Sequence, residues 1–313
     1  MRKDAKVLKT VKDPAHIAGY YENGGHSGHT YQYEGFKVNK YFKSDRFELL
    51  DENFKRKNGE PMQGIGLEVE TTCNTIDDSD VLAEVIDKMV FSHFPEDLWK
   101  FQKDGSLSGH SSVECITQVM TIAFIRNHYK DFKLMYDHYF KHLGIKCNSS
   151  CGMHTNMSNA LFGKTQEAQE EAIRKLFYIV NRWYEITCPL FNRRIDATQY
   201  CRRMNYEDAK TMDLHSFCSN HGVCFNLGHI DEGRIELRLV GPQTSFGCFR
   251  NTMECVFFLI NRVRTIKWED CDDVYKIFQG CNQYVYDRLR TKCNLLQETL
   301  DNIRQKIKYD DFI

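Results

Sequence analysis

The stretch Gly64-Ile-Gly-Leu-Glu-Val-Glu70 is the part of the sequence that decides the expected fold. Its apolar residues alternate with glycine and glutamate, which is typical of a β-strand with one face in the core. The opposite face carries Glu68 and Glu70, and residues two apart on a strand point the same way, about 7 Å apart. The stretch therefore predicts a strand that presents two carboxylates away from the core.

Three later segments repeat this alternation of apolar and polar residues. They are 112–118 with Glu114, 152–158 with His154 and Asn156, and 234–240 with Glu236 and Arg238. If all four strands share one sheet, its polar face gathers carboxylates, an imidazole and a guanidinium. Such clusters hold Mg²⁺ or Mn²⁺, and arginine is added where a phosphate is gripped. The pattern suits phosphoryl transfer from a nucleotide.

The composition narrows the class of protein. With 313 residues, 42% hydrophobic and 27% charged, the chain is typical of a soluble globular protein. The net charge of -1 gives no global attraction for nucleic acid. No stretch approaches the roughly 18 apolar residues of a membrane span. The 13 cysteines are odd in number and irregularly spaced, and the first residues lack an apolar run, so we expect free thiols in a reducing, cytoplasmic setting.

The order of patterns divides the chain into three parts. They are an irregular N-terminal segment 1–60, a segment 61–266 that carries the alternating strands, and a C-terminal helical extension 267–313. Helices are expected at 122–143, from an N-cap at Thr165 to Ile186 with Pro189 as the stop, at 246–266, and in one C-terminal helix from about 285 to 303. Segment 222–227 is expected to form a hairpin with the strand of Glu236.

A basic stretch at 191–205 contains Arg193, Arg194, Arg202 and Arg203. A run of charges is usually a solvated face, and binding of a phosphate is the alternative interpretation.

Five motifs together resemble those of the amidoligases, relatives of glutamine synthetase and glutamate-cysteine ligase that are common in bacteria and bacteriophages. They are Gly64-Ile-Gly-Leu-Glu-Val-Glu70, Asp104-Gly-Ser-Leu107, Val113-Glu-Cys-Ile-Thr117, Ser150-Cys-Gly-Met-His-Thr-Asn156 and Arg234-Ile-Glu-Leu-Arg238. The resemblance covers about residues 60 to 265. It implies that segment 61–266 is a catalytic domain with an α+β fold. Its curved, mostly antiparallel sheet would be backed by helices and would hold ATP and two or three Mg²⁺ or Mn²⁺ ions on its concave face. It also implies that the protein is located in the cytoplasm of a bacterium or of a phage-infected host cell.

The implied reaction is ATP-dependent ligation of a carboxylate to an amine through an acyl phosphate. The substrates would be small molecules or peptides, and a homo-oligomer is left open. By motif, the resemblance assigns metal binding to Glu68, Glu70, Glu114, His154 and Glu236. It assigns catalytic roles to Glu68, Glu236, Arg238, which would stabilise the transferring phosphate, and Asp104, at the substrate end. Contacts to cofactor or substrate fall to Asn156, Asn226, Arg194, Arg202, Arg203 and Arg238.

Other classes of function stay open at this point. Cys147, Cys151 and His154, together with Cys218, His221, Cys224 and the intervening Cys201, offer ligands for a zinc-binding interaction module, although their spacings follow no standard zinc motif. A kinase-like phosphotransferase on the same sheet is a second alternative. A scaffold without activity is a third, and the intact set of Glu, His and Arg positions argues against it.

Overall fold

The protein is α+β, with strands that pair mostly antiparallel in an open sheet and helices that back it. The computed structural model describes residues 21–23, 29–31, 63–77, 79–86, 94, 99–103, 107–108, 111–117, 119–196, 201–217 and 222–307. Contacts divide the chain into two units: unit 1 comprises Met1–Glu60, Ile65–Thr155 and Pro242–Phe246, and unit 2 comprises Pro61–Gly64, Asn156–Gly241 and Gly247–Ile313. The expected domain boundaries at 60 and 266 stay a prediction, as does a concave, glutamine synthetase-like face.

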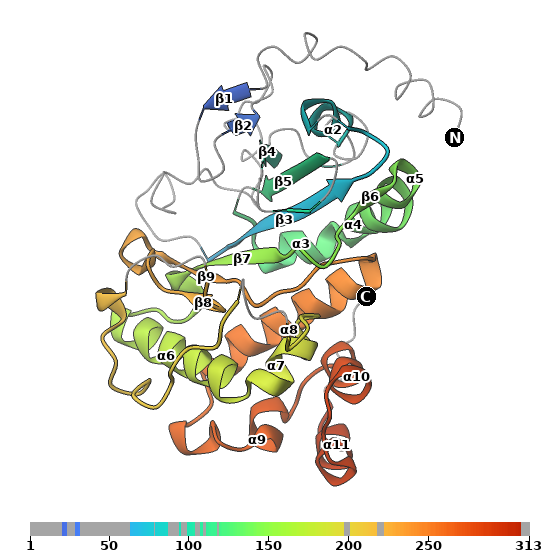
Figure 1. Cartoon of the computed structure of the whole chain (residues 1–313). Helices are drawn as coiled ribbons and strands as arrows, with labels where there is room; N and C mark the ends of the chain where they lie inside the picture. The colour runs from blue at the N-terminus through green and yellow to red at the C-terminus, as the bar shows by residue number, and fades with distance from the viewer. Residues whose placement is uncertain are drawn as a thin grey trace. The chain divides into compact units, whose positions relative to one another are not determined.

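Unit 1 is built on antiparallel strands in the order β1-β2-β4-β5-β3, with β6 and β7 also beside β3 (Figure 1). The strands are β1 Tyr21–Asn23, β2 His29–Tyr31, β3 Ile65–Cys73, β4 Trp99–Lys103, β5 Ser111–Thr117, β6 Ile145–Lys146 and β7 Met153–Ser158, whose last three residues belong to unit 2. The expected strands at 64–70, 112–118 and 152–158 are confirmed to within a few residues. In the register between β3 and β5, Glu70 lies opposite Glu114.

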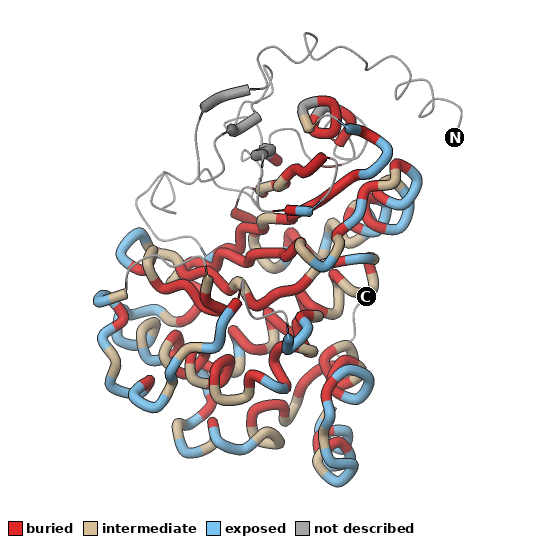
Figure 2. Tube along the Cα trace, viewed as in Figure 1, coloured by how far each residue is buried: buried red, intermediate tan, exposed pale blue. Residues whose placement is uncertain are grey.

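The core of unit 1 follows the alternation in the sequence. Ile65, Leu67 and Val69 of β3 are at most 1% exposed, and β3 is buried along almost all of its length in Figure 2. The ring centroids of Trp99 in β4 and Phe132 lie 6.3 Å apart in an edge-to-face contact, and the Phe94 ring packs against both. Aromatic contacts of this geometry add to the gain from apolar burial. The short helix α2, Ser79–Val85, adds Leu82 and Val85 to the core.

The single helix expected at 122–143 is instead a chain of four helical pieces. They are α3 Ile122–Asn127, α4 Tyr129–Lys133, the π-helical η5 Leu134–Phe140 and α5 Lys141–Leu143. The break between α3 and α4 falls at His128, whose ring stacks on Phe124 at 3.7 Å and whose Nδ1 contacts the Phe124 carbonyl at 3.0 Å. A side chain that bonds to the preceding turn competes with the regular helix, so the expectation of one regular helix was wrong.

Unit 2 combines a hairpin with several helices. The hairpin pairs β8 Phe225–Asn226 with β9 Arg234–Leu237, as expected, and the short helix η8 Ile230–Glu232 forms its connection. Helix α6, Gln166–Arg182, packs on the hairpin through Phe177, whose ring lies 5.8 Å from that of Phe225. Further elements are η6 Asn159–Leu161, α7 Tyr184–Leu190, η7 Leu214–Ser216 and α8 Phe246–Val263, which starts at the last residue of unit 1.

The expected stop of helix α6 at Pro189 was wrong. Helix α6 ends at Arg182, and Pro189 lies inside α7, one residue before its end. The Thr187 hydroxyl donates to the carbonyls of Val180 at 2.9 Å and of Trp183 at 3.1 Å. The first of these bonds gives the Val180 carbonyl a partner in the last turn of α6, and the second joins two amides that already donate to the Trp183 carbonyl at the start of α7. Both favour the break at Trp183.

The C-terminal region also contains more helices than expected. They are η9 Trp268–Asp270, α9 Val274–Phe278, α10 Gln283–Lys292 and α11 Gln297–Arg304. The predicted single helix was wrong because Cys293 adopts an extended backbone after α10. Its buried thiol donates to the Ile186 carbonyl at 3.4 Å, which ties the break to α7.

Two further findings concern the whole described part of the chain. No helix there combines the length and the apolar character that a membrane span needs. Within the same residues no disulfide joins two cysteines. Burial raises the pKa of Cys188 and of Cys293 to about 12, so both stay thiols at neutral pH.

The N-cap of α6 gives a direct test of this fold. The hydroxyl of Thr165 accepts a hydrogen bond from the Ala168 amide, as expected from the sequence. Thr165→Ala should lower the free energy of unfolding by about 1 kcal/mol, measured by urea denaturation. The control is Thr291→Ala in α10, because that hydroxyl donates to a carbonyl of its own helix and caps nothing. Equal losses in the two variants would contradict the assigned cap.

Candidate functional site

The sequence-predicted site residues of unit 1 converge on one point. Glu70 and Glu114 lie opposite each other on neighbouring strands, and His154 of β7 joins them. Potential ligand atoms of these three residues lie within 4.8 Å of one another. Glu70 and His154 are buried and Glu114 is partly exposed. The structure thus brings together three of the residues expected to bind metal.

Glu68 lies beside this cluster and contacts the other side of the imidazole. Its Oε2 is 3.0 Å from Nδ1 of His154, whereas Nε2 of His154 is 3.5 Å from Oε1 of Glu70. The second oxygen of Glu70 accepts a short hydrogen bond from the Gly152 amide. Glu68 on β3 thus restricts the His154 ring, and the Gly152 amide, just before β7, restricts the Glu70 carboxylate.

The donor set fits a divalent cation. Two carboxylates directly opposite each other on adjacent strands repel, and a bound cation would relieve that repulsion. Carboxylate oxygens suit Mg²⁺ and Mn²⁺, and an imidazole extends the choice toward transition metals. Glu70, Glu114 and His154 are therefore the candidate metal ligands, and Mn²⁺ is the appropriate probe.

Unit 2 contains a second polar group, centred on β9. Glu236 is 4% exposed, and its two oxygens contact different partners. Oε1 is 2.5 Å from Nη1 of Arg238, and Oε2 accepts a hydrogen bond from Nδ2 of Asn226 at 2.9 Å. Asn226 lies directly opposite Glu236 in the hairpin register. A guanidinium held by a fixed carboxylate is oriented before any ligand arrives.

Arg234 was given no role in the sequence analysis, although it shares the face of Glu236 and Arg238 by the period of two. Its Nη1 donates to Oδ1 of Asn156 at 2.6 Å, and its Nη2 lies 3.6 Å from Oε2 of Glu232. The alternation of polar residues along β9 was the signal that would have found it. We refer to Arg234, Glu236, Arg238, Asn156 and Asn226 as the β9 polar group.

Arg193 lies apart from the basic surface to which the sequence assigned it. The side chain is only 5% exposed, and it donates to the carbonyls of Val240 at 2.7 Å, Arg238 at 3.3 Å and Leu239 at 3.4 Å. The next residue, Gly241, lies directly against the residue before Arg193: a Cβ at this position would be only 2.1 Å from the Asn192 carbonyl oxygen. Arg193 therefore supports the backbone that carries Arg238.

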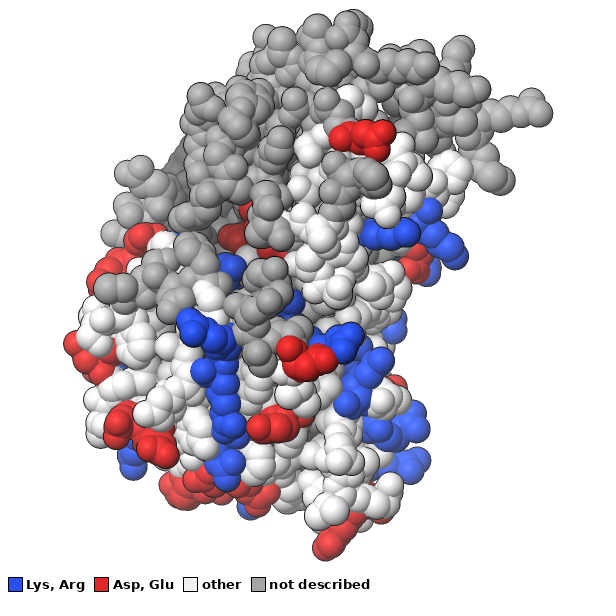
Figure 3. All heavy atoms as spheres, in the orientation of Figure 1, with Lys and Arg blue, Asp and Glu red and all other residues white. Residues whose placement is uncertain are grey.

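The remaining predicted arginines lie on exposed surface of unit 2. Arg194 pairs with Asp196 at 2.6 Å, Arg203 contacts Glu185 at 3.3 Å, and the Arg202 side chain contacts the Gly222 carbonyl at 3.4 Å. Their roles in cofactor binding stay a prediction. Asp104 lies outside the described residues. Figure 3 shows basic and acidic side chains interspersed on the face it draws, in keeping with the near-zero net charge.

The proposed zinc ligands are only partly described, since Cys218 and His221 lie outside the described residues. Within the described ranges, neither Cys147, Cys151 nor Cys224 belongs to a group of three or more potential metal ligands. Cys151 and Cys224 instead contact side-chain oxygens, of Asn148 at 3.6 Å and of Asn181 at 3.2 Å.

No protein-family model matches the chain, and the comparison with curated proteins finds no match either. Any functional assignment therefore depends on the residues of the two groups described above and on the motifs in the sequence.

Removal of one carboxylate tests the metal cluster. Mn²⁺ should raise the midpoint of thermal unfolding of the unchanged protein, because an ion that binds only the folded state stabilises it. Glu114→Gln should weaken Mn²⁺ binding by about 10-fold or more and reduce this shift.

The matched control is Glu269→Gln, whose side chain is 72% exposed and pairs with Lys267. Calorimetric titration with Mn²⁺ measures the affinity directly. An equal affinity in the Glu114 variant and the unchanged protein would remove Glu114 from the ligands.

Proposed function

We propose that the protein is an ATP- and Mg²⁺-dependent ligase that joins a carboxylate to an amine. The observation that carries the proposal is the convergence of Glu70, Glu114 and His154 within 4.8 Å. The Glu236–Arg238 pair on β9 adds a positioned guanidinium. The order of motifs along the chain, which resembles that of the amidoligases, supplies the type of reaction.

The reaction consists of two balanced steps. A carboxylate oxygen of the acid substrate attacks the γ-phosphorus of ATP, and ADP leaves. The amine then attacks the acyl carbon, inorganic phosphate leaves, and the amine loses a proton. A divalent cation bound by Glu70, Glu114 and His154 would neutralise phosphate oxygens while charge develops on them.

Arg238 has the role of gripping the transferred phosphate. Its side chain is 13% exposed and contacts Glu236, so little side-chain entropy is left to lose when an anion binds. Arginine donates two parallel hydrogen bonds to phosphate, which the single ammonium of lysine cannot reproduce. Asn226 keeps Glu236 in place and thereby holds the orientation of Arg238.

An acid and an amine should both be required for turnover. We expect release of ADP and phosphate from ATP and Mg²⁺ only when pools of carboxylic acids and amines, such as amino acids, peptides and polyamines, are supplied together. Mass spectrometry of the mixture should show a product with the mass of an amide. ADP release that needs the acid but not the amine would support a phosphotransferase instead, and would contradict the ligase.

Substitutions on β9 test the assigned residues. Glu236→Ala should abolish ligation, and Arg238→Lys should lower kcat/KM by about 100-fold or more. The controls are Glu269→Ala and Arg290→Lys, which change exposed residues of unit 2 with surface partners. Circular dichroism checks that each variant is folded. Retained turnover in folded Glu236→Ala would exclude an essential role for that carboxylate.

A further inference from the structure

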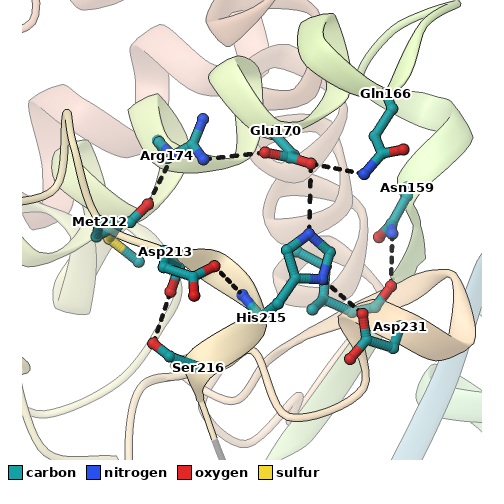
Figure 4. Close-up of polar contacts among 10 residues, drawn as sticks. Asn159, Gln166, Glu170, Arg174, Met212, Asp213, His215, Ser216 and Asp231 are labelled. Atoms are coloured by element: carbon teal, nitrogen blue, oxygen red, sulfur yellow. Dashed lines mark hydrogen bonds and ion pairs between the residues drawn. The ribbon is translucent and has the colours of Figure 1, made fainter.

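A histidine of unit 2 lies between two carboxylates from different elements (Figure 4). His215 belongs to η7. Its Nδ1 is 2.5 Å from Oδ1 of Asp231 in η8, and its Nε2 is 3.3 Å from Oε1 of Glu170 in α6. Both ring nitrogens can donate only in the protonated imidazolium. The arrangement therefore favours the charged form of His215.

The same geometry argues against a metal site at His215. A single carboxylate contacts each ring nitrogen, and within the described part of the chain His215 belongs to no group of three or more potential metal ligands. Glu170 is also engaged by other donors, because Gln166 and Arg174 each donate to it at 2.9 Å. His215 therefore bridges α6 and η8 through an ion pair to each.

The charged groups around His215 come from three elements. Helix α6 contributes Glu170, with Arg174 paired to it, and η8 contributes Asp231. On the loop itself, Asp213 accepts a hydrogen bond from the His215 amide at 3.0 Å. Hydrogen bonds to Asp231 and then Glu170 raise the pKa of His215 above its ordinary 6.5. The pKa of Glu170 is lowered, chiefly by the hydrogen bond from Gln166, then by those from His215 and Arg174.

His215 lies near the end of an excursion of the chain that we call the 203–217 loop. At its base, the Arg202 carbonyl accepts from the Cys224 amide at 3.0 Å, and the Cys224 carbonyl accepts from the Arg238 amide at 3.0 Å. The loop is also held by Nε of Arg174, which donates to the Met212 carbonyl at 2.9 Å. That bond does not titrate, because arginine stays protonated. His215 supplies the titratable attachment.

We propose that protonated His215 clasps the 203–217 loop onto α6 and η8, and that its deprotonation loosens the loop. The contribution of His215 to the clasp is fully present below pH 6.5 and is lost as the pH rises through its raised pKa. The contribution of Glu170 has the opposite sign: it is present above 4.5 and is lost as the pH falls through its lowered pKa. The clasp therefore holds from the lowered pKa of Glu170 up to the raised pKa of His215.

A consequence for the β9 polar group rests on the proposed function. The base of the loop bonds to the backbone of Arg238 through Cys224. Loosening of the loop removes support from the strand that carries this arginine, so ligation should weaken at high pH together with the clasp.

Hydrogen exchange of the amides in the 203–217 loop tests the clasp without any assay of activity. Rates are measured at about pH 6 and about pH 9 and corrected for the intrinsic pH dependence of exchange. Exposed ion pairs are weak, so we expect opening to increase by about two- to five-fold at the higher pH. Equal protection at the two pH values would overturn the proposal.

Three variants separate the clasp from other attachments. His215→Gln should remove the pH dependence and exchange at both values like the unchanged protein at high pH. Arg174→Gln should speed exchange at both values and keep the dependence. His229→Gln is the matched control, since His229 pairs with Glu232 three residues away and does not bridge to α6; it should behave like the unchanged protein. A dependence that persists in His215→Gln would overturn the clasp.

Carbon-13 labelling of histidine side chains gives a second readout. The resonance that disappears in His215→Gln should titrate above 6.5, and Asp231→Asn should lower its midpoint. A midpoint at or below 6.5 would overturn the clasp. If exchange in the loop does not depend on pH, the clasp is wrong whatever the ligase assays show. If exchange depends on pH as expected but no ATP-dependent ligation is found, only the proposed function is wrong.

Discussion

The pairing of β3 with β5 is the constraint on which the candidate metal cluster of unit 1 depends. Their register places Glu70 opposite Glu114 and Val69 opposite Cys115, so carboxylates share one face and apolar groups share the other. A slip of one residue would turn the carboxylates of one strand into the core, at a large cost in free energy. Burial of the apolar face is thus what holds two repelling groups close enough to share a cation.

The β9 polar group in unit 2 depends on a different kind of support. Arg193 is buried and donates to three successive carbonyls at the end of β9, where the regular ladder stops. A buried guanidinium is tolerated where its donors are satisfied. This support fixes the backbone of Arg238 while Glu236 fixes its side chain. The orientation of Arg238, the arginine that we propose binds phosphate, is therefore maintained by a second, buried arginine.

The 203–217 loop shows how attachments of different chemistry are combined in one segment. Arg174 binds its backbone with a donor that keeps its proton, whereas His215 binds two carboxylates with a ring that loses one. The first attachment is constant over the physiological range of pH and the second is not. A loop held in both ways stays attached when the histidine is neutral, but opens more often.

Local patterns in the sequence determined the strands that carry Glu68, Glu70, Glu114, His154 and Glu236, because alternation with a period of two assigns each side chain to a face. They also determined the cap at Thr165, which depends on residues three apart. Tertiary structure alone decided that Arg193 is buried and that His215 meets Glu170 across 45 residues. Such contacts depend on how distant elements pack, and no periodicity along the chain encodes which exposed histidine will find two carboxylates.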